Sequence, residues 1–255
     1  MNNKAIGIFD SGIGGLMVLK EMIKKIPNEK YIYLGDIKNF PYGEKSKKDI
    51  IKYTKNNIKT LLKHDVKLII IACGTATSQA LDEVKKDFDI PIIGIIESTV
   101  NYISTLNLDK IGVMATNGTI NSKAWEKAIK EKNKKIKVFN LACPMLANLA
   151  EKEEINTKKG IQAIHRYTEF FKKNNVNNII LGCTHYPIYD DMIKNEFNGN
   201  VNLINTGIFI AKNVEDFLIK NNMQNDSMKI TKPQIIITKD EADFSQKAKN
   251  ILENK

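Results

Sequence analysis

The chain has 255 residues, of which 42% are hydrophobic, and a formal net charge of +10. This length allows two modest domains or one large one, each with a buried core. The sequence has no apolar run near the roughly 20 residues that cross a bilayer, and its start, MNNKAIGIFD, is not typical of a secretion signal. We therefore expect a cytoplasmic protein without a membrane partner, whose three cysteines stay reduced.

Short apolar runs alternate with longer amphipathic ones along the chain, which is the pattern of an α/β protein with mostly parallel strands. The predicted strands cover 4–9, 30–34, 67–72, 91–95, 109–114, 136–141, 177–182, 201–204 and 234–238. Helices are expected between them. Leu16, Leu19 and Met22 lie on one apolar helical stripe. Ser46 and Asp49 have the spacing of a capping box that opens another helix.

Two pairs of similar segments indicate two similar α/β halves. AIGIFDSGIGG at 5–15 resembles KIGVMATNGTI at 110–120, and LIIIACGT at 68–75 resembles NIILGCTH at 178–185. Short matches also arise by chance in α/β chains, so a true duplication stays open. With two halves, we predict a first domain of 1–97 plus 206–255 and a second of 98–205. Because ligands bind beyond the carboxyl ends of parallel strands, the active site is expected in the cleft between them.

Lysine supplies nearly all of the positive charge, for example in EKSKKDIIKYTK at 44–55 and KAIKEKNKKIK at 127–137. These segments could be a nucleic-acid patch or the solvated faces of helices. Few arginines are interleaved with the lysines, and Tyr53 is the one aromatic residue in these two segments, which favours helix faces. We therefore do not expect a nucleic-acid partner, although a positive field would help to attract a small anionic substrate.

The loop FDSGIGGL at 9–16 follows the first predicted strand and precedes a helix. Its first two glycines and the later Asp36 imitate a dinucleotide site, but Met17 occupies the third glycine position. Asp10 would also repel a pyrophosphate. We favour the alternative in which Asp10 and Ser11 face a ligand while the glycines let the backbone come close.

Cys73 and Cys183 each end an apolar strand and precede polar residues. They could be buried apolar side chains, metal ligands, a redox pair, or the acid and base on opposite faces of one substrate. The chain has no CxxC motif or histidine cluster, so we expect no metal. The neighbouring Thr184 and His185 argue against inert burial. Inverting a carbon centre needs a base on one face and an acid on the other, and a thiol with an ordinary pKa of about 8.5 suits both roles.

Together these segments resemble the glutamate racemases of the cofactor-independent aspartate/glutamate racemase superfamily. The match runs through GIFDSGIGGL, YLGD, FPYG, IACGTAT, IGVMATNGTINSKAW, ACP and LGCTHYP, and so covers most of the chain. Each motif is weak alone: the segment around Pro41 would otherwise indicate only a turn. Cys143, in the apolar setting of NLACPMLANL, is expected to be structural.

The resemblance implies a racemase without a cofactor, in which the C-terminal segment returns to the first domain. It makes Cys73 and Cys183 the catalytic acid and base, assisted by Asp10, His185 and Glu151. The substrate-binding residues that it implies are Asp10, Ser11, Pro41, Tyr42, Gly43, Gly74, Thr75, Thr116, Thr119, Thr184 and His185. It also implies a homodimer that makes D-glutamate for peptidoglycan.

The sequence departs from the family pattern in two places. Gly74 stands where the family usually has Asn, and Asn205 with Thr206 stands where Asp-Ser is more frequent. Neither departure touches the proton chemistry, but both bear on substrate choice. The alternatives are therefore an aspartate or other amino-acid racemase on the same scaffold, and a non-catalytic binding module for small anions.

Overall fold

The computed structural model describes residues 3–225, 230–240 and 243–253. Its strands agree with the predicted ones to within one residue at each end. They are β1 (Ala5–Asp10), β2 (Tyr31–Gly35), β3 (Val66–Ile71), β4 (Ile92–Gly94), β5 (Lys110–Ala115), β6 (Lys137–Ala142), β7 (Asn178–Leu181), β8 (Asn202–Asn205) and β9 (Gln234–Ile237). Strands β1 and β3 are buried along their whole length, and apart from Asp10 and Lys67 their side chains are apolar or absent.

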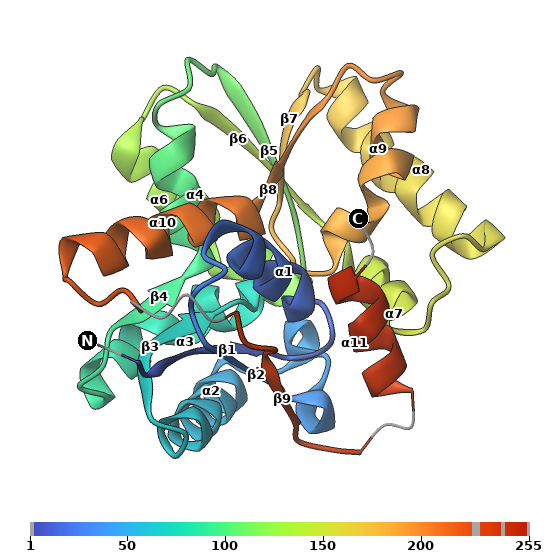
Figure 1. Cartoon of the computed structure of the whole chain (residues 1–255). Coiled ribbons are helices and arrows are strands. Elements are labelled where there is room, and N and C mark those ends of the chain that lie inside the picture. The colour runs from blue at the N-terminus through green and yellow to red at the C-terminus, as the bar shows by residue number, and fades with distance from the viewer. Residues whose placement is uncertain (1–2, 226–229, 241–242, 254–255) are drawn as a thin grey trace.

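The described strands form two parallel sheets, which confirms the predicted fold class. One has the order β4-β3-β1-β2-β9 and the other, read from β8, has the order β8-β7-β5-β6. The strands that lead to Cys73 and Cys183, β3 and β7, each lie between a short edge strand and the first strand of their half. The two halves therefore share one plan, and Figure 1 shows them as separate layers of the molecule.

The C-terminal segment returns to the first sheet, because β9 pairs with β2. The predicted domain boundaries fall inside one helix, after residue 97, and at the junction between β8 and the next helix, after residue 205. The exact extents of the two domains stay a prediction.

The helices cover both faces of the sheets (Figure 1). They are α1 (Gly15–Lys25), α2 (Lys47–Leu62), α3 (Gly74–Asp87), α4 (Ile95–Ile103), α5 (Asn117–Ser122), α6 (Ala124–Lys132), α7 (Pro144–Glu151), α8 (Lys158–Lys173), α9 (Asp190–Glu196), α10 (Thr206–Lys220) and α11 (Phe244–Glu253). The predicted stripe of α1 is buried at Leu16, Leu19 and Met22. Ser46 caps α2, since its Oγ accepts from the Asp49 amide at 3.2 Å.

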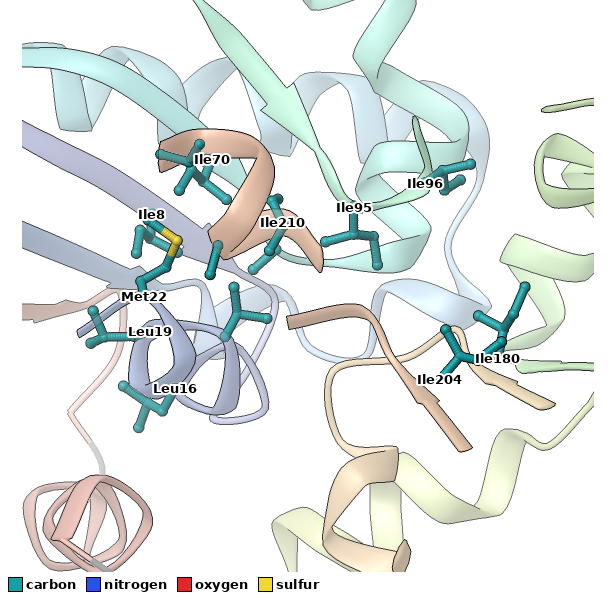
Figure 2. Close-up of a cluster of buried hydrophobic side chains, with 14 of the residues drawn as sticks. Ile8, Leu16, Leu19, Met22, Ile70, Ile95, Ile96, Ile180, Ile204 and Ile210 are labelled. Atoms are coloured by element: carbon teal, nitrogen blue, oxygen red, sulfur yellow. The ribbon is translucent and has the colours of Figure 1, made fainter. Parts of the chain in front are cut away.

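One apolar core is shared by the two halves. Ile8 and Ile70 come from the first sheet, and Ile180 and Ile204 come from the second. Figure 2 shows Ile95 of α4 between the two groups, beside α10. A continuous core of this kind holds the two halves together.

Candidate functional site

The carboxyl ends of β1, β3, β5 and β7 lead to one small cavity between the two sheets. Its volume is about 20 Å³, room for about one water molecule. The cavity is lined by Ser11, Phe40, Pro41, Tyr42, Gly43, Cys73, Gly74, Thr75, Thr116, Ala147, Cys183, Thr184 and His185. A groove of about 1200 Å³ runs over α3, α4 and α6, but it shares only Gly43 with this lining and contains neither sulfur.

Cys73 lies where the first sheet passes into α3. Its Sγ caps the helix by accepting from the Ala76 amide at 3.5 Å, and it donates to Ser11 Oγ at 3.5 Å. Burial, together with the negative charge of Asp10, raises the pKa of the Cys73 thiol to about 12. In the absence of a bound cation this sulfur is therefore a neutral thiol at neutral pH.

Cys183 lies in the corresponding place after β7, and a histidine supports it. Its Sγ is 3.6 Å from His185 Nδ1, and His185 Nε2 is 2.8 Å from Glu151 Oε1. Burial alone lowers the pKa of the imidazole, but the contacts with Cys183 and Glu151 outweigh burial and raise that pKa well above its usual value. A protonated His185 donates from both ring nitrogens, so it can stabilise a thiolate at Cys183.

Glu151 is the last residue of α7 in the second half, and it also accepts a hydrogen bond from the first half. Its Oε1 accepts from the Ile13 amide at 2.7 Å, in the glycine loop that precedes α1. Burial raises the pKa of this carboxyl. The hydrogen bond from His185, the positive charge of His185 and the hydrogen bond from the Ile13 amide outweigh burial and bring that pKa below its usual value. The carboxylate therefore stays charged and fixes the imidazole from the side away from the sulfur.

Asp10 makes a second bridge between the halves. It ends β1 and is fully buried. Its Oδ1 accepts from the Gly12 amide at 3.0 Å, and its Oδ2 accepts from Thr184 Oγ1 at 3.1 Å. Burial raises the pKa of this carboxyl, although the charge of His185 partly opposes the rise. Asp10 lies behind the cavity lining and acts on it through Thr184.

Three hydroxyl groups meet across the opening between the halves. Thr75 Oγ1 of α3 lies 2.8 Å from Thr116 Oγ1 and 3.3 Å from Thr119 Oγ1. The latter two lie 3.0 Å apart. In this closed arrangement the hydroxyls satisfy one another, so a ligand with carboxylate groups would have to replace these bonds.

Tyr42 lines the cavity with its ring, while its hydroxyl is committed elsewhere. It donates to Asp36 Oδ2 at 2.5 Å, and Asp36 also accepts from Asn39, Asn57 and Thr238. Asp36, which in the sequence imitates the ribose-binding acid of a dinucleotide site, thus stabilises the loop before α2. Sequence reasoning did not single out Asn57, although an amide on the apolar face of α2 was a signal for it.

The structure brings together most of the predicted site residues. Asp10, Thr119 and Glu151 do not line the cavity but bond to residues that do. Sequence reasoning missed two lining residues, Phe40 and Ala147. Phe40 was signalled by its place directly before the Pro-Tyr-Gly segment, and its ring lies 5.8 Å from that of His185.

Cys143 lies outside the cavity lining, fully buried in an apolar cluster of the second half. Within the described residues, no group of three or more His, Cys, Asp or Glu side chains could hold a metal ion. No described helix is long and apolar enough to cross a membrane.

Comparison with known proteins gives the same family throughout. The model of the Asp/Glu/Hydantoin racemase family matches residues 15–213. The glutamate racemase of Bacillus cereus is 36% identical over 225 residues, 88% of this chain and 84% of that protein. That of Thermoanaerobacter pseudethanolicus is 33% identical over 256 residues, 100% of this chain and 96% of that protein.

Solved structures show the same likeness. A glutamate racemase isoform from Bacillus anthracis has a TM-score of 0.94 and 31% identity, covering 99% of this chain and 95% of that one. The glutamate racemase of Francisella tularensis, solved with D-glutamate, has a TM-score of 0.91 and 34% identity, covering 100% and 96%. The chain therefore belongs to the Asp/Glu/Hydantoin racemase family and is an isomerase of that family.

Proposed function

We propose that this protein interconverts L- and D-glutamate, with Cys73 and Cys183 as the two proton-transfer groups. The observation that carries the proposal is that these two sulfur-bearing residues come from different sheets and line the same cavity. The relatives named above are glutamate racemases, which supports glutamate as the substrate.

In the proposed reaction one sulfur acts as a thiolate and the other as a thiol. The thiolate takes the proton from the α-carbon, so an S–H bond forms while the C–H electron pair remains on the substrate, delocalised into its carboxylate. The other thiol then gives its proton to the opposite face, where a new C–H bond forms and that sulfur becomes a thiolate. Two bases on opposite faces are what inversion at carbon requires.

The raised pKa of Cys73 sets a condition on this scheme. Its thiolate is favoured only when positive charge comes close, because burial and Asp10 both oppose ionisation. The ammonium group of an amino acid would supply that charge. His185 would serve Cys183 in the same way.

Substrate carboxylates would be held by the start of α3 and by the threonine hydroxyls. The first amides of a helix of this length point toward its N-terminus and favour a negative group there. Thr75, Thr116 and Thr119 would exchange their mutual bonds for bonds to the ligand. Because the closed cavity holds about one water molecule, binding requires the halves to separate and then close again.

A chiral assay of purified protein on a panel of L- and D-amino acids tests the proposal. We expect racemisation of glutamate in both directions and much slower turnover of aspartate. Faster turnover of aspartate or another amino acid would reassign the substrate. Binding of glutamate without turnover would favour the alternative that the protein is a non-catalytic binding module for small anions.

We further infer a cytoplasmic homodimer that supplies D-glutamate for peptidoglycan, on the basis of the family resemblance. Restored growth of a bacterium that requires D-glutamate would test the biological role. Sedimentation equilibrium would test the dimer, and a single species with the mass of one chain, 28.9 kDa, would exclude it.

A further inference from the structure

We propose that Lys247, in the C-terminal helix α11, is a positioning residue for the His185–Glu151 pair, which it holds through a hydrogen bond to the main chain of Glu151. The inference rests on the proposed function, because that pair supports the thiolate of Cys183. Lys247 lies outside the cavity lining, and no motif in the sequence pointed to it.

Lys247 lies on the face of α11 that packs against the rest of the protein. Phe244, Ala248 and Ile251 have the spacing that places them on the same helical face as Lys247. Phe244 and Ala248 are buried in the shared apolar core, and Ile251 packs against that core. Lys247 is itself half-buried. A lysine on a packed face runs its aliphatic stem along apolar surface and carries its ammonium to a polar group or to water.

The polar group that the ammonium reaches is the end of α7. Helix α11 packs against α1, and Figure 1 shows it beside α7. The Nζ atom of Lys247 donates to Glu151 O at 3.2 Å. Glu151 is the last residue of α7, so its carbonyl has no amide partner within the helix. A cation at a helix C-terminus is also favoured by the helix dipole.

The other carbonyls at the end of α7 are satisfied by the loop that follows it. Those of Asn148, Leu149 and Ala150 accept from the amides of residues 152–154 at 3.2, 2.8 and 3.1 Å. The carbonyl of Glu151 instead accepts from a side chain that is distant in the sequence. Lys247 therefore completes the C-terminal cap of α7.

The capped residue is also the one that orients the histidine. Glu151 Oε1 accepts from His185 Nε2 at 2.8 Å, so the position of the last turn of α7 decides where this carboxylate lies. Helix α7 and His185 belong to the same half, and their contact does not depend on how far the cavity opens. Without the bond from Lys247, the end of α7 would fray and the carboxylate would lose its fixed place beside the imidazole.

The charge of Lys247 acts in the same sense as its hydrogen bond. The charged or titratable groups around the pair are Asp10 at the end of β1, Lys20 of α1, Glu153 after α7, Cys183 after β7 and Lys247 of α11. Lys20, Glu153, His185 and Lys247 line one pocket of about 410 Å³. The positive charge of Lys247 is among the causes that lower the pKa of Glu151. It therefore favours the charged carboxylate that His185 contacts.

The experiment compares Lys247→Met, Lys247→Arg and a control, Lys249→Met. The first variant removes the donor and the charge but keeps an aliphatic side chain, and the second keeps both. Lys249 is two residues further along α11, on the opposite face, and its side chain is 61% exposed. Three quantities are measured: the low-field proton NMR resonance of His185 Nε2–H, kcat/KM for glutamate as a function of pH, and the melting temperature.

We expect the His185 resonance of Lys247→Met to move upfield and broaden, because the bond to Glu151 is weakened. Its kcat/KM should fall about 3- to 10-fold, the loss that one hydrogen bond brings. The acid limb of the profile should move to higher pH, since losing a nearby cation disfavours both the Glu151 carboxylate and a thiolate at Cys183. This profile reports groups of the free enzyme, so it tests the pair before substrate binds.

Lys247→Arg and Lys249→Met should match the wild type in the resonance and in the pH profile. An unchanged resonance and profile in Lys247→Met would overturn the proposal, even with a lower melting temperature, because the role would then be structural only. The same changes in Lys249→Met, or no rescue by Lys247→Arg, would also overturn it. If the wild type does not racemise glutamate, the proposed function fails, while the His185 resonance still tests the role of Lys247.

Should Lys247→Met not fold, the wild type itself decides. Reductive methylation of lysines, followed by mass spectrometry, gives the rate at which each ammonium group reacts. We expect Lys247 to react more slowly than Lys249, because its Nζ is bonded to Glu151 O. Equal rates at the two lysines would contradict the hydrogen bond on which the proposal stands.

Discussion

Replacing Glu151 by Gln tests the buried Glu151–His185 pair. Glu151 accepts from His185 Nε2 at 2.8 Å, and the two side chains are only 14% and 3% exposed. The substitution removes the negative charge but keeps a side chain of the same shape, which can still accept a hydrogen bond from the Ile13 amide. We therefore expect the pKa of His185 to fall, since only the contact with Cys183 would still raise it, and the protein to lose stability.

The size of the loss follows from burial. Breaking a buried pair costs about 3–5 kcal/mol, and the hydrogen bond that Gln retains offsets about 1 kcal/mol, so we expect a loss of about 2–4 kcal/mol. The lowered pKa of Glu151 gives stability that is present above pH 4.5 and lost as pH falls through the lowered value. The raised pKa of His185 gives stability that is present below pH 6.5 and lost as pH rises through the raised value. The effect is therefore largest between pH 4.5 and 6.5.

The control is Glu196→Gln, which removes the acid from a more exposed cluster, where Glu196 contacts His165 at 3.1 Å and Lys172 at 2.7 Å. His165 and Lys172 are 61% and 30% exposed, so the loss of this cluster should cost about 1 kcal/mol. Urea unfolding at several pH values gives both free energies, and NMR titration gives the pKa of each imidazole. Equal losses in the two variants, or an unchanged pKa of His185, would refute the reasoning.

Three further predictions follow from the same geometry. Cys73→Ala and Cys183→Ala should each nearly abolish racemisation of both enantiomers in a chiral assay, because one face of the substrate loses its acid or base; near-wild-type rates in either variant would contradict the two-thiol scheme. Burial raises the pKa of Cys73 from 9.0 to about 12, so the stability that the protonated, buried thiol gives the protein is complete below pH 9.0 and is lost as pH rises toward 12. Alkylation of Cys73 should therefore accelerate over this range. Acceleration that is complete by pH 9.0 would be inconsistent with the buried thiol. Lys67→Met removes the cation that pairs with Glu29 at 2.7 Å, where the two side chains are 1% and 2% exposed. Urea unfolding should show that the free energy of unfolding falls by about 3–5 kcal/mol. A fall below about 1 kcal/mol would mean that this pair contributes no more than an exposed one.

The strands could be predicted because parallel sheets covered on both faces need continuous apolar runs, such as LIII at 68–71. The positions of Cys73 and Cys183 followed from the same runs, since both residues come where a strand ends. The cap of α2 followed from the spacing of Ser46 and Asp49. These features depend on neighbours in the sequence.

The contacts across the cleft could not be predicted in this way. The bond from the Ile13 amide to Glu151, and the contact between Gly74 and Gly182, depend on how the two halves lie against each other. No local pattern encodes that orientation, which is set by the shared core around Ile95 and Ile204. Asp36 is a related case, because its partner Thr238 arrives from the distant C-terminal segment.

The central claim is that two thiols act on opposite faces of one α-carbon. The most direct measurement follows L-glutamate in deuterium oxide at low conversion, with mass or proton NMR analysis of each enantiomer. The account predicts deuterium at the α-carbon of the newly formed D-glutamate, because the donating S–H of Cys73 or Cys183 exchanges with solvent between turnovers. The recovered L-glutamate should carry little label. Unlabelled D-glutamate, or equal early labelling of both enantiomers, would contradict the account.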